Sequence, residues 1–196
     1  MVLGITGGVG AGKSRILDIL REVYGARIIQ ADQVAAELEQ PGQPGYEALV
    51  ETFGAGILNR EGQLDRAAFA QLIFQDSQAL SQVNGILHPL TWRRIRQMTE
   101  EQPEQLTAVE SALFDRQSRD YCGKLVFVDT DEANRISRLM ENRGYSREKC
   151  LDIMKNQPDR ETFLSLADYV IDNNGSLEQV RAQVDRVMEE LTNEVR

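Results

Sequence analysis

The chain opens with an apolar segment, a run of glycines and an amphipathic segment. Val2–Thr6 is short, apolar and partly β-branched, and Gly7–Gly12 interrupts it. Ser14–Tyr24 then carries apolar residues at helical spacing, and Gly25 follows it. This pattern predicts a strand, a glycine-rich loop and a helix that ends at Gly25.

A second apolar segment, Arg27–Ala31, is predicted to be a strand, and Asp32 follows it directly. Two strands on either side of one helix form a βαβ unit, and such a unit implies a parallel sheet. We expect the second strand to lie beside the first, so that Asp32 emerges at the same sheet edge as the glycine loop.

Helical periodicity dominates residues 33–105, and no long flexible linker separates them from the rest, which predicts an inserted helical part. Further strands are expected at 106–109, 125–129 and 169–171, and helices at 131–143, 146–156 and 176–191. The chain is therefore predicted to be one α/β domain. Its parts are a core of about 1–32, 106–130 and 157–196, an insertion of about 33–105 and a helical segment of about 131–156.

Composition narrows the classes of protein that the pattern allows. A chain of 196 residues with 41% hydrophobic residues can bury one substantial core, and its net charge of -9 argues against a general nucleic-acid surface. No apolar run of about 18 residues and no leader pattern is present, so we expect a cytoplasmic protein with no membrane partner. Cys122 and Cys150 lie far apart and are expected to be reduced thiols. No obligate protein partner is evident.

The strongest chemical signal is Gly7–Ser14, which fits G-x-x-x-x-G-K-[ST] between a strand and a helix. Glycines allow the backbone N–H groups to turn inward around phosphate oxygens, and the helix start adds its positive end. Lys13 is then placed to meet the β- and γ-phosphates, and the Ser14 hydroxyl to ligate Mg²⁺. The nucleotide-binding residues expected on this basis are Gly8, Val9, Gly10, Ala11, Gly12, Lys13, Ser14 and Arg15.

The loop alone does not say whether the nucleotide is hydrolysed, used as a switch or used for transfer. The Asn-Lys-x-Asp guanine reader of Ras-type GTPases has no match in the sequence. Leu125–Asp129 imitates the metal-holding strand of motor ATPases, but Asp129 could equally cap the following helix. The small size of the chain favours a compact metabolite kinase.

Two further sets of residues have both a functional and a structural reading. Asp32 could orient an acceptor hydroxyl and take its proton, or it could cap a helix over residues 33–39. The arginines of the segment after the fourth predicted strand could close over a triphosphate or form an ordinary solvated face. These arginines are Arg135, Arg138, Arg143 and Arg147.

Beyond the loop, the chain resembles the dephospho-CoA kinase family almost from end to end. The similarity covers the opening 4–14 and the acidic segment 28–32, and then continues through shorter matches. These are Phe53-Gly54, 62–66, Phe74, Leu87-His88-Pro89, Arg138-Leu139, Gln157 and 167–175. So many separated matches in order are more specific than the phosphate loop, which many families share.

The resemblance implies a P-loop kinase fold of three α/β/α layers, with a five-stranded parallel sheet, a helical substrate-binding insertion and a helical lid over about 131–156. It implies an enzyme that uses ATP and Mg²⁺ to phosphorylate the ribose 3′-hydroxyl of dephospho-CoA, giving coenzyme A and ADP. Asp32 would be the base, and Lys13 and Arg138 would act on the phosphates, with Arg143 assisting. Arg66 and His88 would belong to the acceptor side; a surface ion pair and a buried histidine at a helix start are their alternatives.

The chain departs from the family pattern at three places. Ser111–Asp115 stands where many relatives carry Pro-Leu-Leu-Phe-Glu, so the acidic role falls to either Asp115 or Glu110. Arg15 stands where a small hydroxyl residue often follows Ser14, which leaves the metal-side residue in place. The second lid arginine is displaced by one residue to Arg143, which is about 100° around a helix.

Two rival functions remain at this point. One is another P-loop kinase that phosphorylates a nucleoside or nucleotide. The other is a noncatalytic nucleotide-binding switch, which the joint presence of Lys13, Ser14 and Asp32 disfavours.

Overall fold

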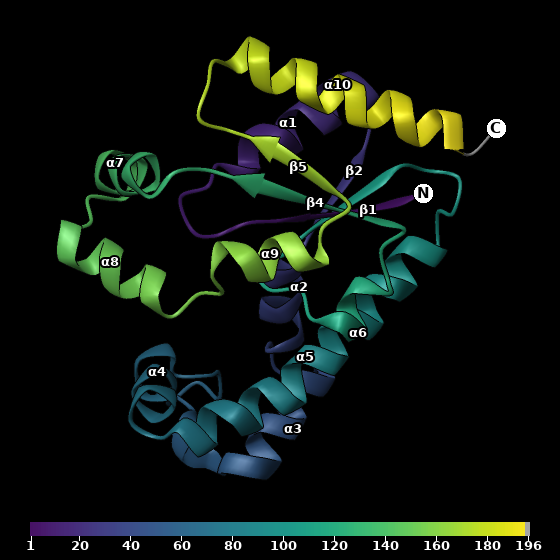
Figure 1. Ribbon diagram of the computed structural model, residues 1–196. Coiled ribbons are helices and arrows are strands. Elements are labelled where there is room, and N and C mark those ends of the chain that lie inside the picture. The colour runs from purple at the N-terminus through teal and green to yellow at the C-terminus, as the bar shows by residue number, and fades with distance from the viewer. Residues whose placement is uncertain (195–196) are drawn as a thin grey trace. The chain divides into compact units, whose positions relative to one another are not determined.

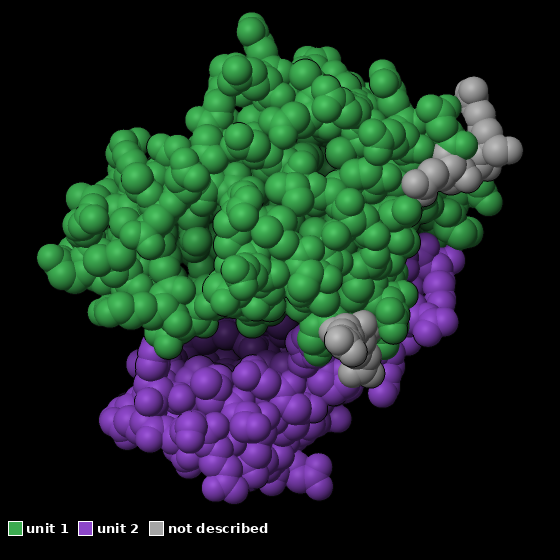
Figure 2. All heavy atoms as spheres, viewed as in Figure 1, with its two compact units in different colours: residues 1–29, 102–196 green, residues 30–101 purple. Residues whose placement is uncertain are grey.

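The computed structural model describes residues 1–194 and confirms the predicted α/β fold with a five-stranded parallel sheet (Figure 1). The chain divides into two compact units (Figure 2). Unit 1 comprises Met1–Ile29 and Gln102–Arg196, and unit 2 comprises Gln30–Glu101. No helix among the described residues has the length and apolarity needed to cross a membrane.

The strands run in the order β2-β3-β1-β4-β5 across the sheet. Their bounds are β1 Val2–Thr6, β2 Arg27–Gln30, β3 Thr107–Glu110, β4 Lys124–Asp129 and β5 Tyr169–Asp172. β1 pairs in parallel with β3 and with β4, and β4 pairs in parallel with β5. The glycine loop therefore leaves the central strand, between the ends of β3 and β4.

The expectation that the second strand lies beside the first is wrong, because β3 lies between them. All four residues of β3 are buried, as suits an interior strand, whereas β2 takes the edge and Arg27 N–H donates to Leu106 O. A βαβ pattern fixes the parallel direction of two strands but does not say how many strands lie between them.

Helices cover both faces of the sheet in unit 1. α1 (Lys13–Tyr24) and α10 (Leu177–Glu194) lie on one face, and α9 (Arg160–Leu166) lies on the other (Figure 1). Alternation along β4 explains this, since Val126 and Val128 pack with α1 and α10, while the Phe127 ring stacks on Phe163 of α9 at 5.0 Å between centroids.

The remaining helices of unit 1 are α6 (Arg116–Arg119), α7 (Glu132–Arg143) and α8 (Arg147–Lys155). α7 and α8 share a small apolar core of Ile136, Leu139 and Cys150. This core fixes the rotation of α7 and thereby the direction of its arginines.

Unit 2 is helical. Its elements are α2 Ala31–Leu38, α3 Pro44–Phe53, η1 Ala55–Ile57, α4 Arg66–Gln75 and α5 Ser77–Glu100. Its buried core comprises Leu49, Ile57, Leu64, Phe69 and Val83. The carboxylates of Asp65 and Asp76 accept N–H groups in the first turns of α4 and α5, which sets where these helices begin.

Gly4 lies in the central strand β1, where neighbouring side chains leave no room for a Cβ. An added Cβ would lie 2.7 Å from Leu125 Cδ1, 3.1 Å from Cys122 Sγ and 3.2 Å from Phe114 Cζ. We expect Gly4→Ala to lower the free energy of unfolding by about 1–3 kcal/mol, because these packed side chains must shift. Urea unfolding measures this. Gly123→Ala is the matched control in unit 1, since its Cβ would meet only Val2 O at 3.4 Å; equal losses in both variants would contradict the packing argument.

Candidate functional site

The glycine loop adopts a conformation that side chains disfavour. Gly7, Gly10 and Gly12 have φ values of 150°, 81° and 84°. The loop closes on itself through Ala11 N–H to Gly8 O, and α1 begins directly after Gly12 without a side-chain cap. The backbone of this loop and the first turn of α1 therefore form the kind of anion site that phosphate-binding loops provide.

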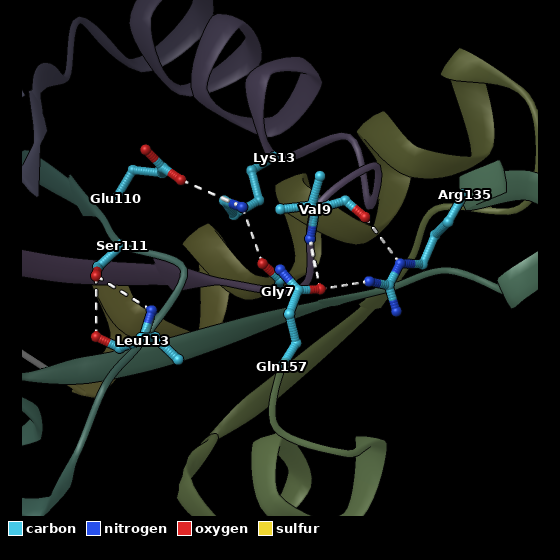
Figure 3. A network of polar contacts seen from close by, with 8 residues as sticks. All are labelled: Gly7, Val9, Lys13, Glu110, Ser111, Leu113, Arg135 and Gln157. Atoms are coloured by element: carbon cyan, nitrogen blue, oxygen red, sulfur yellow. Dashed lines mark hydrogen bonds and ion pairs between the residues drawn. The ribbon is translucent and has the colours of Figure 1, made fainter. Parts of the chain in front are cut away.

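Lys13 lies across this loop. Its Nζ donates to Gly7 O at 2.8 Å and lies 3.3 Å from Glu110 Oε1, and both side chains are largely buried (Figure 3). Glu110 ends β3, opposite Ile5 of β1. The Asp115 carboxylate instead accepts the Ser118 N–H at 2.7 Å and caps α6. Of the two acidic candidates, Glu110 is the one that contacts the loop lysine.

Arg135 and Gln157 hold the first half of the loop (Figure 3). Arg135 donates from Nε to Val9 O at 2.9 Å and from Nη2 to Gln157 Oε1 at 2.7 Å. Gln157 Oε1 also accepts the Val9 N–H at 3.1 Å. A Cβ at Gly8 would collide with the Arg135 guanidinium, and burial lowers the pKa of Arg135. The loop is thus fastened to α7 and to the segment after α8.

The second half of the loop is held at one atom, the carbonyl oxygen of Ala11. It accepts from Asn173 Nδ2 at 2.7 Å, Thr130 Oγ1 at 2.9 Å and Arg138 Nη1 at 3.2 Å. Asn173 and Thr130 are buried. Asn173 follows β5, Thr130 follows β4 and Arg138 lies on α7. Segments that are distant in the sequence therefore fix the shape of the loop.

The lid arginines divide into two groups. Arg135 and Arg138 contact the loop, whereas Arg143 is exposed in the last turn of α7. Arg143 follows Arg138 by five residues, which turns it about 140° around the helix. Its expected contact with phosphates stays a prediction.

Asp129, at the end of β4, has a partner that the sequence did not indicate. Its carboxylate accepts from Arg160 Nε at 2.8 Å and lies 2.7 Å from Arg160 Nη2. Asp131, and not Asp129, occupies the N-cap position of α7, so the capping interpretation of Asp129 is wrong.

Three expected acceptor-side residues lie in unit 2. Asp32 is exposed in the first turn of α2, which begins at Ala31, so Asp32 does not cap a helix over residues 33–39. The cap position belongs to Gln30. The strand turns directly into the helix, which is why the boundary falls earlier than the sequence pattern indicated.

Arg66, at the start of α4, lies 2.5 Å from Glu39 Oε2, and the Arg66 side chain remains 61% exposed. Asp65 accepts the Ala67 and Ala68 N–H groups. The acidic partner of Arg66 is therefore the largely buried Glu39, which anchors the guanidinium at one edge and leaves the rest of it accessible.

His88 lies inside the helix α5, and the expectation that it is buried at a helix start is wrong. It is half-buried, and its Nε2 accepts from Trp92 Nε1 at 2.9 Å. Pro89 also lies inside α5, which proline normally interrupts. The packing of the buried Trp92 and Ile95 after it keeps the helix continuous.

The structure brings the loop residues Lys13, Ser14 and Arg15 together with Arg138 of α7 in unit 1, whereas Arg143 is exposed in the last turn of α7. Sequence reasoning missed the contacts of Thr130 and Asn173 with the loop, because their separation along the chain leaves no local pattern. Among the described residues, no cluster of three or more His, Cys, Asp or Glu side chains could hold a metal ion.

The chain matches a family model and known proteins over most of its length. The family model described as dephospho-CoA kinase matches residues 1–179. The dephospho-CoA kinase of Carboxydothermus hydrogenoformans is 33% identical over 192 residues, covering 96% of this chain and 93% of the relative. That of Corynebacterium glutamicum is 37% identical over 194 residues, covering 96% and 98%.

Among solved structures, TT1252 from Thermus thermophilus is similar to the chain with a TM-score of 0.82 and 29% identity, over 97% of both chains. The family match thus covers the phosphate loop, residues 33–105 and Asn173, which follows β5. From the family match and the length of these alignments, we conclude that the chain belongs to the dephospho-CoA kinase family.

Proposed function

We propose that the chain transfers the γ-phosphoryl group of ATP to the ribose 3′-hydroxyl of dephospho-CoA, giving coenzyme A and ADP, in the cytoplasm. The observation that carries the proposal is a phosphate loop, with Lys13 lying across it, in a chain that matches this kinase family over most of its length. The proposal involves no nucleic-acid or membrane partner.

On the donor side, the N–H groups of Gly10–Ser14 bind the phosphate oxygens, and the N-terminus of α1 adds its positive end. Lys13 exchanges its contact with Gly7 O for the β- and γ-phosphates, while Glu110 keeps the ammonium group near the loop. Arg138 offsets the charge that spreads over the transferred group.

Ser14 fits a Mg²⁺ role because it carries a hydroxyl and is exposed in the first turn of α1, directly beside the loop. When bound with ATP, Mg²⁺ would neutralise charge on the β- and γ-phosphate oxygens.

On the acceptor side, unit 2 binds dephospho-CoA as the substrate-binding insertion. The Asp32 carboxylate orients the 3′-hydroxyl and receives its proton as the hydroxyl oxygen bonds to the γ-phosphorus and the bond from that phosphorus to ADP breaks. The exposed part of the Arg66 guanidinium, held by Glu39, and His88 contact the anionic substrate.

We expect Asp32→Asn to lower kcat by about 10²–10⁴-fold, because the amide cannot take the hydroxyl proton. ADP affinity, measured by calorimetry, should stay near that of the natural chain. Turnover is measured by ADP release coupled to a second enzyme, with dephospho-CoA present and absent. Unchanged turnover would remove Asp32 from this role.

The same assay tests the acceptor itself. Faster ADP release with adenosine than with dephospho-CoA would indicate a different metabolite kinase. Slow release that no acceptor accelerates would indicate a nucleotide switch.

Lys13→Ala should reduce turnover by about 10²–10³-fold, because a charged donor to the transferring phosphate is lost. Lys155→Ala is the matched control, since Lys155 is an exposed lysine on α8 that pairs with the exposed Asp152. If both variants retain near-normal turnover, the loop does not bind the reacting phosphates.

A further inference from the structure

Arg15 is the residue of the phosphate loop and first turn of α1 that departs from the family pattern, and the structure gives it a defined place. Its Nη1 donates to Asn173 Oδ1 at 3.0 Å, so the side chain reaches from the third residue of α1 towards the end of β5. Asn173 is 0% exposed, so the Arg15 guanidinium is held by a fully buried side chain.

Arg138, on α7, also binds Asn173. It donates from Nη2 to Asn173 O at 2.6 Å and from Nη1 to Ala11 O at 3.2 Å. Asn173 Nδ2 donates to that same Ala11 oxygen. Two guanidinium groups are thus held by one asparagine at the edge of the phosphate loop.

Among the described residues, this pair of cations has only neutral partners. Within the part of the chain that the structure describes, Arg15 and Arg138 bind the oxygens of Asn173 and Ala11, and no carboxylate forms an ion pair with either. The pKa of Arg138 is lowered, first by burial and then by the charge of Arg15. Like charges held together without a counterion cost free energy, and an anion bound beside them removes that cost.

We propose that Arg15 binds the phosphates that ATP and ADP share, as a second guanidinium beside Arg138. The inference rests on the proposed function, because the anion is taken to be the nucleotide of that reaction. A guanidinium meets phosphate oxygens in pairs, which a small hydroxyl residue at this position cannot do.

The role differs from that of Lys13. ADP keeps the shared phosphates after transfer, so Arg15 stabilises substrate, transition state and product complexes alike. Such uniform binding lowers KM for ATP and slows ADP release more than it raises kcat.

The test is calorimetric titration of the full-length chain and its variants with ADP, at low and at high salt. Arg15→Gln keeps a donor for Asn173 Oδ1 but removes the charge. We expect its Kd for ADP to rise about tenfold at low salt and to depend less on salt than that of the natural chain. KM for ATP should rise by a larger factor than kcat falls.

Arg21→Gln is the matched control, because it removes the same charge from an exposed position on the same helix. Its ADP affinity should equal that of the natural chain. Arg15→Lys restores the charge without the paired donors, and its Kd should fall between those of Arg15→Gln and the natural chain.

Thermal unfolding separates ligand binding from a structural role. Without ligand, Arg15→Gln should unfold at the same temperature as the natural chain or higher, because the repulsion with Arg138 is relieved, and the stabilisation by ADP should be smaller. A lower unfolding temperature without ligand, together with unchanged ADP affinity, would make Arg15 only a support for Asn173 and would overturn the proposal.

The titration needs no acceptor, so the two proposals can fail separately. Weaker ADP binding in Arg15→Gln, in a chain that does not phosphorylate dephospho-CoA, would support the Arg15 role and contradict the proposed function. If the natural chain turns over dephospho-CoA normally and Arg15→Gln binds ADP with unchanged affinity, the proposed function is supported and the Arg15 role is contradicted.

Discussion

The carbonyl oxygen of Ala11 is the point on which the site depends. A phosphate loop must keep its N–H groups turned inward, in glycine conformations that an unsupported chain would leave. Three donors from segments more than 100 residues away converge on this one oxygen, and they come from Thr130, Arg138 and Asn173. The strands β4 and β5 and the helix α7 therefore act together as the support of a loop that lies at the other end of the sequence.

The hydrogen bonds that hold the loop also bring positive charge to the place where an anion binds. The donors that shape the loop include Arg135 and Arg138, so the contacts that support the loop also place positive charge beside it. The chain as a whole carries a net charge of -9. Lys13 is neutralised by Glu110, whereas Arg15 and Arg138 bind only neutral oxygens among residues 1–194 that the structure describes. Anion binding at the loop thus follows from a local arrangement of side chains and not from the overall charge of the protein.

Local patterns predicted most of the fold and part of the site. The strand, loop and helix around Gly7–Ser14 follow from short-range spacing, and so do the other strands, whose predicted bounds differ from the observed ones by at most one residue. The position of β2 beside β3 could not be read, because a helical connection does not record which strand it passes. The sequence left the acidic role between Asp115 and Glu110, and it did not indicate the contact of Glu110 with Lys13 or that of Asn173 with Ala11, since each contact depends on a partner brought close only by folding.

The most direct test of this account is the response of the loop amides to ADP, followed by ¹⁵N NMR on the full-length chain. If the loop held by Ala11 binds the phosphates, the amide signals of Gly10 and Gly12 should shift more on ADP addition than those of Gly54 and Gly62, which lie in unit 2. Saturable ADP binding that leaves the Gly10 and Gly12 signals unmoved would contradict it.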